Sequence, residues 1–598
     1  MYECLCMQQS VRYEISCDPN QHYFCVRMQL SNVAAPLRLR LPAWLPGSYM
    51  IRDFAKHIVA FSAVGTSGAL DYIRPDKNTW EIRHPDEQVT IEYKVYAFDL
   101  SVRTAWLNDE FGFFNPSAVC LECLNWDGPL EVELILPPDS DWSISTGLKR
   151  VTTLTPQHQR FCADDYASLI DHPFLIGELD VIPFQVNNIE HELVLAGRHY
   201  ADREQVANDL TAICQRQIDF FQGHVPFHHY KFLTMVVGDG FGGLEHRNST
   251  ALLTSRHSLE APKGAAAQAS AANDYFTFLS LCSHEYFHSW NVKQLRPRRF
   301  HPYHLQSEQY TEQLWFYEGV TSYLDDFFVH QAGIMTAEQF LNRTSETLTR
   351  ALRGLGPLRQ SLTESSQTTW TTFYQQNENS QNAIVSYYTK GAVIALLADL
   401  AIRTISVDRH SLADVMNYLY HRHAATGTSP KDLIAGFEKF TNADFAATLQ
   451  HWLQAKQPPE LTEWFSAFGI QVEPATADPL TLQPQTSQRE PRLPVSFGAV
   501  MQEQGGRYEV ARIFEGSAAA QAGLSVKDRL VAIDGLEAKS TNVQYAMRRA
   551  SPGDSVRLHV FTHDRLRELT LVWQAPPADG YKLTLQDKSL AKRWLKLD

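Results

Sequence analysis

Short stretches that alternate hydrophobic and polar residues dominate the first part of the chain. Residues 23–28, 37–41 and 89–96 follow this period of two, which predicts strands with one buried face. The segment 41–54 is dense in Pro, Gly and aromatic residues. We interpret it as a packed turn, with a role in lining an active-site cleft as the alternative. The pattern predicts a β-sandwich-like N-terminal domain over residues 1–179.

From residue 180 the pattern changes to a mixture of helices and strands. A helix is expected near 202–222, and the apolar stretch 231–237 indicates a strand. This strand leads into the glycine-rich segment 238–246, whose glycines allow the backbone to approach a ligand closely. Further helices are expected at 311–331, within 382–405, and near 411–421, 430–440 and 444–456. These elements predict an α/β and α-helical catalytic domain over residues 180–471.

Five prolines between residues 472 and 494 indicate a partly extended linker. A compact domain is expected after it, over residues 495–576, because 508–513 and 556–561 have the pattern of strands. Residues 577–598 are left as a C-terminal tail. The expected fold class is therefore a multidomain α+β protein with a small third domain.

Composition and charge narrow the functional class. The 598 residues are 44% hydrophobic and 20% charged, with a formal net charge of −14, which suits a soluble enzyme and argues against binding to nucleic acid or an anionic membrane. The nine cysteines are scattered and odd in number, which predicts reduced thiols. No leader-like pattern opens the chain and no apolar stretch approaches 18 residues, so we expect a cytoplasmic protein without a membrane partner.

The strongest chemical signal is the segment His284-Glu285-Tyr286-Phe287-His288. On a helix the two histidines lie on one face, where they can bind one zinc ion per chain, with Glu285 beside it. Zinc in a catalytic site takes three protein ligands and lowers the pKa of a water in the fourth position, so that Glu285 can act as the general base. The pattern predicts a metallohydrolase.

Glu318 is the favoured third zinc ligand, because it lies among aromatic residues where an unpaired carboxylate would be costly. Asp325, two helical turns later, is a candidate for orienting a ligand histidine. The competing third ligands lie in more polar surroundings: Glu308, Glu312, His301 and His304.

Taken together, these residues resemble the glycyl aminopeptidase family of PDZ-containing zinc metallopeptidases, over nearly the whole chain. The matching landmarks are Trp44-Leu45-Pro46-Gly47-Ser48-Tyr49 with Arg52-Asp53, Gly242-Gly243-Leu244-Glu245-His246, the zinc motif with Glu318-Gly319, and a C-terminal module from Gly516 to Gly535. The resemblance implies a thermolysin-like catalytic domain, a PDZ domain and an insertion at 291–310.

The resemblance also implies roles for individual residues. Glu245, with Gly242 and Gly243, matches the motif that holds the free amino group of the substrate, and Tyr388 matches the tyrosine that steadies the oxyanion. For Glu245 the alternative is a structural salt bridge with Arg247 or with a basic residue of 296–299. The expected partners are peptides with a free N-terminus and a C-terminal peptide ligand of the PDZ domain.

The leading hypothesis is a zinc aminopeptidase that favours small N-terminal residues such as Gly or Ala, as the family resemblance implies. Two rivals are a zinc endopeptidase with the same core and a PDZ scaffold with weak or no catalysis. The intact zinc motif argues against the scaffold, and Glu245 argues against the endopeptidase.

Overall fold

A computed structural model describes residues 10–32, 34–138, 140–261, 270–476 and 493–597. The chain divides into two compact units, one formed by residues 1–309 with 423–427 and the other by residues 310–422 with 428–598. The boundary falls inside the expected catalytic domain. No helix among the described residues is long and apolar enough to span a bilayer.

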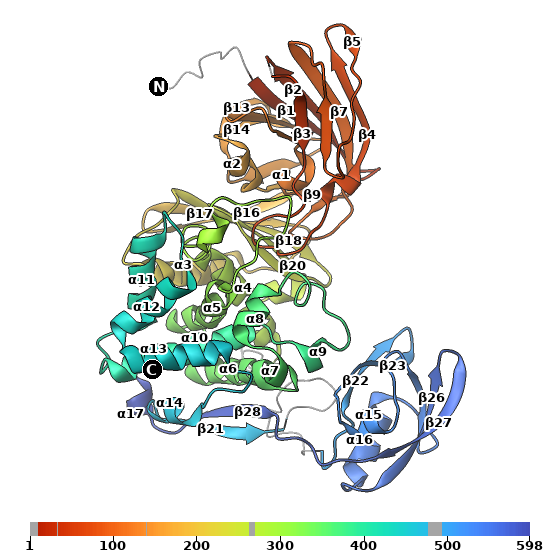
Figure 1. The fold of residues 1–598 in the computed structure, drawn as a ribbon, viewed down its shortest axis with the longest axis vertical. Coiled ribbons are helices and arrows are strands. Elements are labelled where there is room, and N and C mark those ends of the chain that lie inside the picture. Colours follow the sequence, from red (N-terminus) through yellow and green to blue (C-terminus); the bar gives the residue numbers. More distant parts are fainter. Residues whose placement is uncertain (1–9, 33, 139, 262–269, 477–492, 598) are drawn as a thin grey trace. The chain divides into compact units, whose positions relative to one another are not determined.

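The first unit begins with the β-rich region that the alternating pattern predicted (Figure 1). Strand β2 (Tyr23–Ser31) buries alternate side chains from Phe24 to Leu30, so one face of its sheet is apolar. The sheet has eight strands in the order β13-β14-β11-β1-β2-β7-β4-β5. The other strands are β1 (Ser10–Asp18), β4 (Ile58–Gly65), β5 (Gly68–Ala69), β7 (Gln88–Tyr96), β11 (Leu130–Ile135), β13 (Lys149–Thr155) and β14 (His158–Ala163).

Two smaller sheets complete the β-rich region. The three-stranded sheet has β10 (Glu122–Cys123), β3 (Leu37–Arg40) and β6 (Thr79–Ile82); the four-stranded sheet has β12 (Ser143–Thr146), β15 (Phe174–Gly177), β9 (Phe111–Phe114) and β8 (Ala105–Leu107). The buried side chains of this region form one hydrophobic core with Leu233, Met235 and Leu253 of the next sheet. The N-terminal region is therefore packed onto the sheet that carries the candidate site.

That next sheet is mixed, with the order β16-β17-β18-β20-β19. Its strands are β16 (Leu179–Val186), β17 (Ile189–Ala196), β18 (His229–Val237), β20 (Ser249–Ser255) and β19 (Phe241–Glu245). The end of the glycine-rich segment 238–246 is thus an edge strand, β19, antiparallel to β20. Its glycines remove side-chain bulk from that edge, which explains how they fit a strand that sequence reasoning did not expect.

Two long helices accompany the mixed sheet in the first unit, α3 (Arg203–Phe220) and α4 (Ser270–Phe287). Asp202 caps α3 by accepting a hydrogen bond from the backbone of Gln205, as expected for an Asp at this position. Residues 262–269 lie outside the described residues, and α4 begins directly after them, at Ser270.

The second unit opens with a π-helical turn, Trp315–Gly319, that continues into α5 (Val320–Gln331). A helix was expected from residue 311, but the Gln313 side chain instead donates from Nε2 to the carbonyl oxygen of Thr428 at 3.2 Å and accepts at Oε1 from the Thr428 hydroxyl at 2.8 Å. The longest apolar helix, α10 (Thr389–Ile405), is buried nearly all round. The other described helices of more than ten residues in this unit are α6 (Ala337–Leu352), α11 (Leu412–His423), α12 (Pro430–Phe440) and α13 (Ala443–Gln454).

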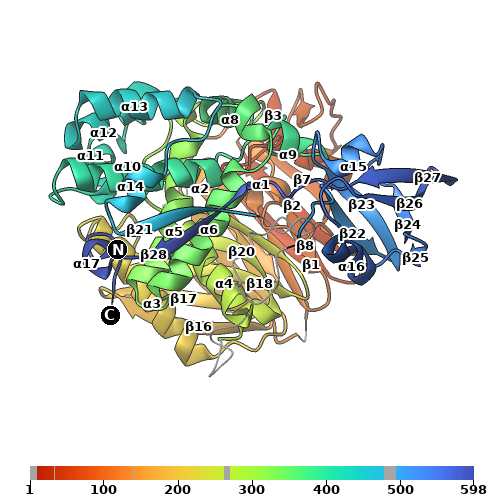
Figure 2. The ribbon, with the colours of Figure 1, turned by 90° about the horizontal axis from the view of Figure 1, so that it is seen from below.

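The expected linker and the expected C-terminal tail each contain residues that form a strand, which the sequence did not indicate. Residues 470–475 form β21 (Ile470–Ala475), which pairs with β28 (Gly580–Leu585) from the segment taken as a tail. Figure 2 shows the two strands side by side. The backbone N–H of Leu583 donates to Ser345 of α6 at 2.9 Å, so the end of the chain packs on the helical unit. Residues 477–492 of the expected linker lie outside the described residues.

Between these two strands the chain forms a separate six-stranded sheet with its own core. Its strands are β22 (Ala499–Gln504), β23 (Arg507–Ile513), β24 (Arg529–Ile533), β25 (Leu536–Glu537), β26 (Ser555–Thr562) and β27 (Arg565–Val572). Helix α16 (Ser540–Arg549) buries Val543 and Met547 against this core. The turn between β24 and β25 is made by Asp534 and Gly535, both with positive φ, as the Asp-Gly pair indicated.

Candidate active site

Helix α4 presents His284 and Glu285 in its last turn and His288 just beyond its end. The backbone N–H of His288 still donates to the carbonyl oxygen of His284, at 3.3 Å, so helical geometry continues through the second histidine. The two imidazole centroids lie 4.7 Å apart. Both rings are therefore on one face, one turn apart, where each can offer a nitrogen to the same ion.

The backbone that follows α4 orients His288. Its Nδ1 lies 2.7 Å from the carbonyl oxygen of Asn291. When Nδ1 carries the proton and donates it to this oxygen, Nε2 keeps its lone pair for a metal ion. The turn after the helix thus selects the tautomer that a metal ligand needs.

Three contacts fix α4 from the side away from the site. Gln217 of α3 donates from Nε2 to the carbonyl oxygen of Ser283 at 2.8 Å, and the Tyr230 hydroxyl donates to the carbonyl oxygen of Glu285 at 3.3 Å. Trp290 stacks on Phe221 with centroids 4.8 Å apart. Buried hydrogen bonds and stacked rings of this kind hold the helix end in one position, which a catalytic geometry requires.

The carboxylate of Glu285 lies against the edge strand β19. A Cβ on Gly243 would collide with Oε1 of Glu285, so only glycine allows this approach. One ligand atom each of Glu245, Glu285 and His288 lies within 4.8 Å of the other two, and all three residues are buried. Two acids and an imidazole gathered in this way suit a divalent cation or a bound ammonium.

Glu245, the last residue of β19, is covered by the segment 41–54. Gly47 of that segment has a φ of 86°, and a Cβ on it would come within 2.6 Å of both carboxylate oxygens. Trp44 donates its indole N–H to the carbonyl oxygen of Ser307 at 2.9 Å. The segment is a packed turn, and it also lines the site, which was the alternative interpretation of its sequence.

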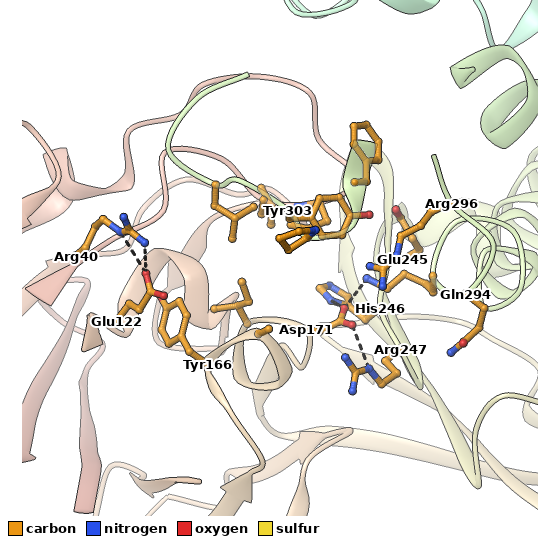
Figure 3. Close-up of a pocket in the computed structure, with 18 residues that line it drawn as sticks. Arg40, Glu122, Tyr166, Asp171, Glu245, His246, Arg247, Gln294, Arg296 and Tyr303 are labelled. Carbon is orange, nitrogen blue, oxygen red and sulfur yellow. Dashed lines mark hydrogen bonds and ion pairs between the residues drawn. The ribbon is translucent and has the colours of Figure 1, made fainter. Parts of the chain in front are cut away.

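A cavity of about 540 Å³ opens beside Glu245 (Figure 3). Glu245, His246 and Arg247 lie on one side of it, and Arg40 with Glu122 lies on the other. The salt bridge expected as an alternative for Glu245 is not formed with Arg247, whose Nε lies 3.5 Å from Asp171 instead. Within the described ranges, no ion pair to Glu245 is present.

Asp171, just after α2 (Tyr166–Ile170), lies next to several basic side chains on the same side of the cavity as Glu245 (Figure 3). Lys293 Nζ lies 2.6 Å from its carboxylate, and His246 Nδ1 lies 3.4 Å away. Burial acts to raise the pKa of Asp171, but Lys293 and His246 outweigh it and hold the pKa well below its usual range. Burial lowers the pKa of His246 despite the nearby carboxylate, so this imidazole is neutral near pH 7.

In the second unit, Glu318 lies in the π-helical turn and is buried. A Cβ on Gly319 would come within 2.5 Å of the Cα of Gly391, so a pair of glycines lets this turn touch α10. π-Helical turns are frequent at functional sites, where they aim a side chain out of the regular helical register. The competing acids Glu308 and Glu312 are exposed.

Tyr388 lies at the N-cap of α10. Its ring stacks on Phe373 with centroids 5.5 Å apart, and the side chain is partly exposed. The neighbouring Tyr387 is buried, and its hydroxyl accepts a hydrogen bond from Thr369 at 3.0 Å. Asp325 of α5 accepts a hydrogen bond from the backbone of Asp326. Of the two tyrosines, Tyr388 is the one with access to solvent.

Sequence reasoning missed three residues of the site. Gly47 was noted only as part of a landmark, Asp171 was not singled out, and Tyr303 lies in the segment 291–310 that was expected to be an insertion. Tyr303 lines the cavity, and the Arg296 guanidinium lies 5.3 Å from its ring centroid. No local pattern marks these residues, because each reaches the site from a distant part of the chain.

Comparison with known proteins gives consistent matches. The model of the peptidase M61 N-terminal domain matches residues 12–178, and that of the M61 glycyl aminopeptidase matches residues 277–394. The chain is 42% identical to an aminopeptidase N family protein from Idiomarina loihiensis, with a TM-score of 0.93; the match covers 98% of this chain and 100% of that one. An M1 zinc metallopeptidase from Deinococcus radiodurans is 11% identical, with a TM-score of 0.49, covering 76% of this chain and 95% of that one. We draw no conclusion from this weaker likeness.

Proposed function

Because the chain belongs to the M61 glycyl aminopeptidase family and is a zinc-dependent aminopeptidase, we propose that Glu245 selects the N-terminal bond and that Glu285 is the general base. The observation that carries this proposal is the group of Glu245, Glu285 and His288, with ligand atoms within 4.8 Å of one another. Glu285 takes a proton from the reacting water. Glu245 binds the α-ammonium of the substrate.

His284, His288 and Glu318 are the proposed zinc ligands. Two imidazoles and a carboxylate are a donor set that could hold this metal. The hydrogen bond from His288 Nδ1 to Asn291 supports the assignment, because it leaves Nε2 for the ion. The burial of Glu318 supports it too, since a buried carboxylate is costly without a cation. When bound, zinc lowers the pKa of a coordinated water and polarises the scissile carbonyl.

Glu285 takes a proton from the attacking water at its carboxylate and passes it to the leaving amine. Its position against Gly243 supports this role, because the missing side chain lets the acid lie directly at the edge strand. Gly242 and Gly243 are proposed as substrate-binding residues, since a bare strand edge lets a peptide backbone approach. Tyr388 is proposed to donate from its hydroxyl to the developing oxyanion.

In this proposal Glu245 pairs with the substrate's α-ammonium. The first peptide bond of the substrate is thereby placed at the reacting water. Two observations support it. The carboxylate lines the cavity, and two cations that line the same cavity are otherwise engaged, since Arg247 and Lys293 both pair with Asp171. Gly47 lies close against the carboxylate, since a Cβ there would come within 2.6 Å of both of its oxygens, and this close packing restricts its motion. We further propose a preference for small N-terminal residues such as Gly or Ala, from the family alone.

The C-terminal six-stranded sheet is proposed to be a PDZ domain that binds a C-terminal peptide. Its support is the residue pattern from Gly516 to Gly535 together with β22, the edge strand of the sheet that the described residues form, and helix α16 on the same small core. A cytoplasmic location is proposed from the cysteines, because Cys17, Cys25, Cys120, Cys123, Cys214 and Cys282, all among the described residues, are free thiols.

The test is a panel of aminoacyl reporter substrates assayed beside an internally quenched, N-acetylated peptide. The proposal predicts cleavage of free-amino reporters and poor cleavage of the blocked peptide. Strong cleavage of the blocked peptide would make the protein an endopeptidase. Metal analysis of protein purified without added zinc should find about one zinc per chain, and its absence would favour a scaffold.

A further inference from the structure

The cavity beside Glu245 carries more positive than negative groups. Four basic side chains line it, Arg40, Arg247, Lys293 and Arg296, against the three carboxylates of Glu122, Asp171 and Glu245. When Glu245 is occupied by a substrate α-ammonium, only two carboxylates remain to balance the four cations. The space next to the bound amino group is then electropositive.

Most of these charges are already paired. Arg40 NH2 lies 2.8 Å from Glu122, on the side of the cavity opposite Glu245 (Figure 3). Lys293 and Arg247 share the single carboxylate of Asp171, at 2.6 and 3.5 Å. One anion therefore serves two cations, with a neutral His246 as the third neighbour, so the group of Asp171, Lys293 and Arg247 keeps a net positive charge.

Arg296 is the cation with no carboxylate partner among the described residues. Its Nε donates to Nε2 of His301 at 2.9 Å, and its guanidinium lies over the ring of Tyr303. Figure 3 shows it on the same side of the cavity as Glu245. These contacts hold the guanidinium in place without neutralising its positive charge, because the imidazole of His301 and the ring of Tyr303 are both neutral.

Resting on the proposed role of Glu245, we infer that this cavity receives the side chain of the substrate's N-terminal residue and favours a carboxylate over an ammonium there. Gly and Ala side chains do not reach into it, so their cleavage is independent of its charge. Longer side chains enter a volume of about 540 Å³, within the range of small-molecule sites, and meet Arg296. The enzyme therefore sorts long N-terminal residues by charge: Glu is accepted and Lys is rejected.

The experiment compares kcat/KM for Ala, Gln, Glu and Lys reporters with the wild-type enzyme. A charge-assisted contact predicts that Glu exceeds Lys by about tenfold to a hundredfold. Arg296→Gln should lower the ratio of Glu to Ala cleavage by about tenfold, and Arg296→Lys should restore part of it. The matched control is Arg299→Gln, an exposed arginine on the same segment that does not line the cavity, and it should leave the ratio unchanged.

The outcomes separate this inference from the proposed function. Cleavage of Ala with Lys equal to or better than Glu overturns the inference and leaves the aminopeptidase assignment standing. An unchanged Glu to Ala ratio in Arg296→Gln also overturns it. Failure of the wild type to cleave any free-amino reporter contradicts the proposed function, and the inference falls with it.

Discussion

Two regions of the first unit bury glutamates in opposite ways. In the N-terminal sheet, Glu133 of β11 is held by Arg12 and Arg160, the latter with Nε at 2.8 Å from the carboxylate. At the candidate active site, Glu245 and Glu285 lie next to each other, and Glu245 has no cation in ion-pair range within the described ranges. The fold neutralises the first carboxylate with its own arginines. We expect Glu245 to meet its positive charge in the bound substrate.

This difference separates a structural acid from a functional one. An acid buried with its own cations contributes to folding and is sensitive to losing either partner. Acids gathered without enough cations cost stability, and such arrangements are found where function requires them. The comparison predicts that substitutions at Glu133 affect the folded state and leave catalysis intact, whereas substitutions at Glu285 and Glu245 do the reverse.

The largest effect is expected for Glu285→Gln. The amide keeps the shape of the side chain but cannot take a proton from water, so turnover should fall about 10³-fold or more. The zinc content of the variant should equal that of the wild type, measured by metal analysis of the same samples. Loss of the metal would instead mean that Glu285 belongs to the ligand set.

For Glu133→Gln the expected loss is in stability. The amide cannot replace the charged hydrogen bonds to Arg12 and Arg160, and Arg160 keeps only its 4.0 Å contact with Glu131, so the expected cost is about 1.5–3 kcal/mol. Urea unfolding should show an earlier first transition, while kcat of the folded enzyme stays at the wild-type value. The matched control is Glu92→Gln, whose half-exposed pair with Arg27 should contribute at most about 1 kcal/mol.

The same acid gives a pH test. Burial acts to raise the pKa of Glu133, but Arg12 and Arg160 outweigh it and lower the pKa to about 2. An acid whose pKa is lower in the folded state than in the unfolded state stabilises the protein at a pH above its unfolded-state pKa. That contribution is lost as the pH falls toward the folded-state pKa. Wild type should therefore lose stability relative to Glu133→Gln between about pH 4.5 and 2. A constant difference across this range would contradict the ion-pair account.

Tyr388→Phe is expected to lower kcat by about 10²–10³-fold with little change in KM, because the lost hydroxyl acts on the oxyanion and not on the bound substrate. Tyr387→Phe is the matched control. Its hydroxyl is occupied by Thr369 and buried, so its removal should affect stability more than turnover. A normal kcat in Tyr388→Phe would remove this tyrosine from the mechanism.

The local parts of this site could be predicted from the sequence. Two histidines four residues apart lie on one helix face whatever surrounds them, and the acid between them is fixed with them. The β-rich start of the chain followed from its alternating pattern for the same reason. In each case the signal lies within a few residues, and backbone geometry alone converts it into structure.

The remaining features depend on long-range packing. The glycine-rich run that includes Gly242 and Gly243 did not indicate a strand, yet pairing with β20 makes it an edge strand. Gly47 and Asp171 come to the site from the N-terminal region, and nothing near them in sequence indicates it. The pairing of β21 with β28 also joins two segments that are separated in sequence by the whole C-terminal six-stranded sheet. A short strand cannot be distinguished from a linker until its partner is known.

Glu245→Gln tests the central claim most directly, with kcat/KM measured on a free-amino peptide and on its N-acetylated form. If Glu245 is reserved for the substrate's ammonium, the variant should lose about 1.5–3 kcal/mol on the free-amino peptide, or one to two powers of ten. Cleavage of the acetylated peptide, poor in the wild type, should change little, and the melting temperature should not fall. An equal loss on both peptides, with a lower melting temperature, would show that Glu245 is a structural acid like Glu133 and would contradict the account.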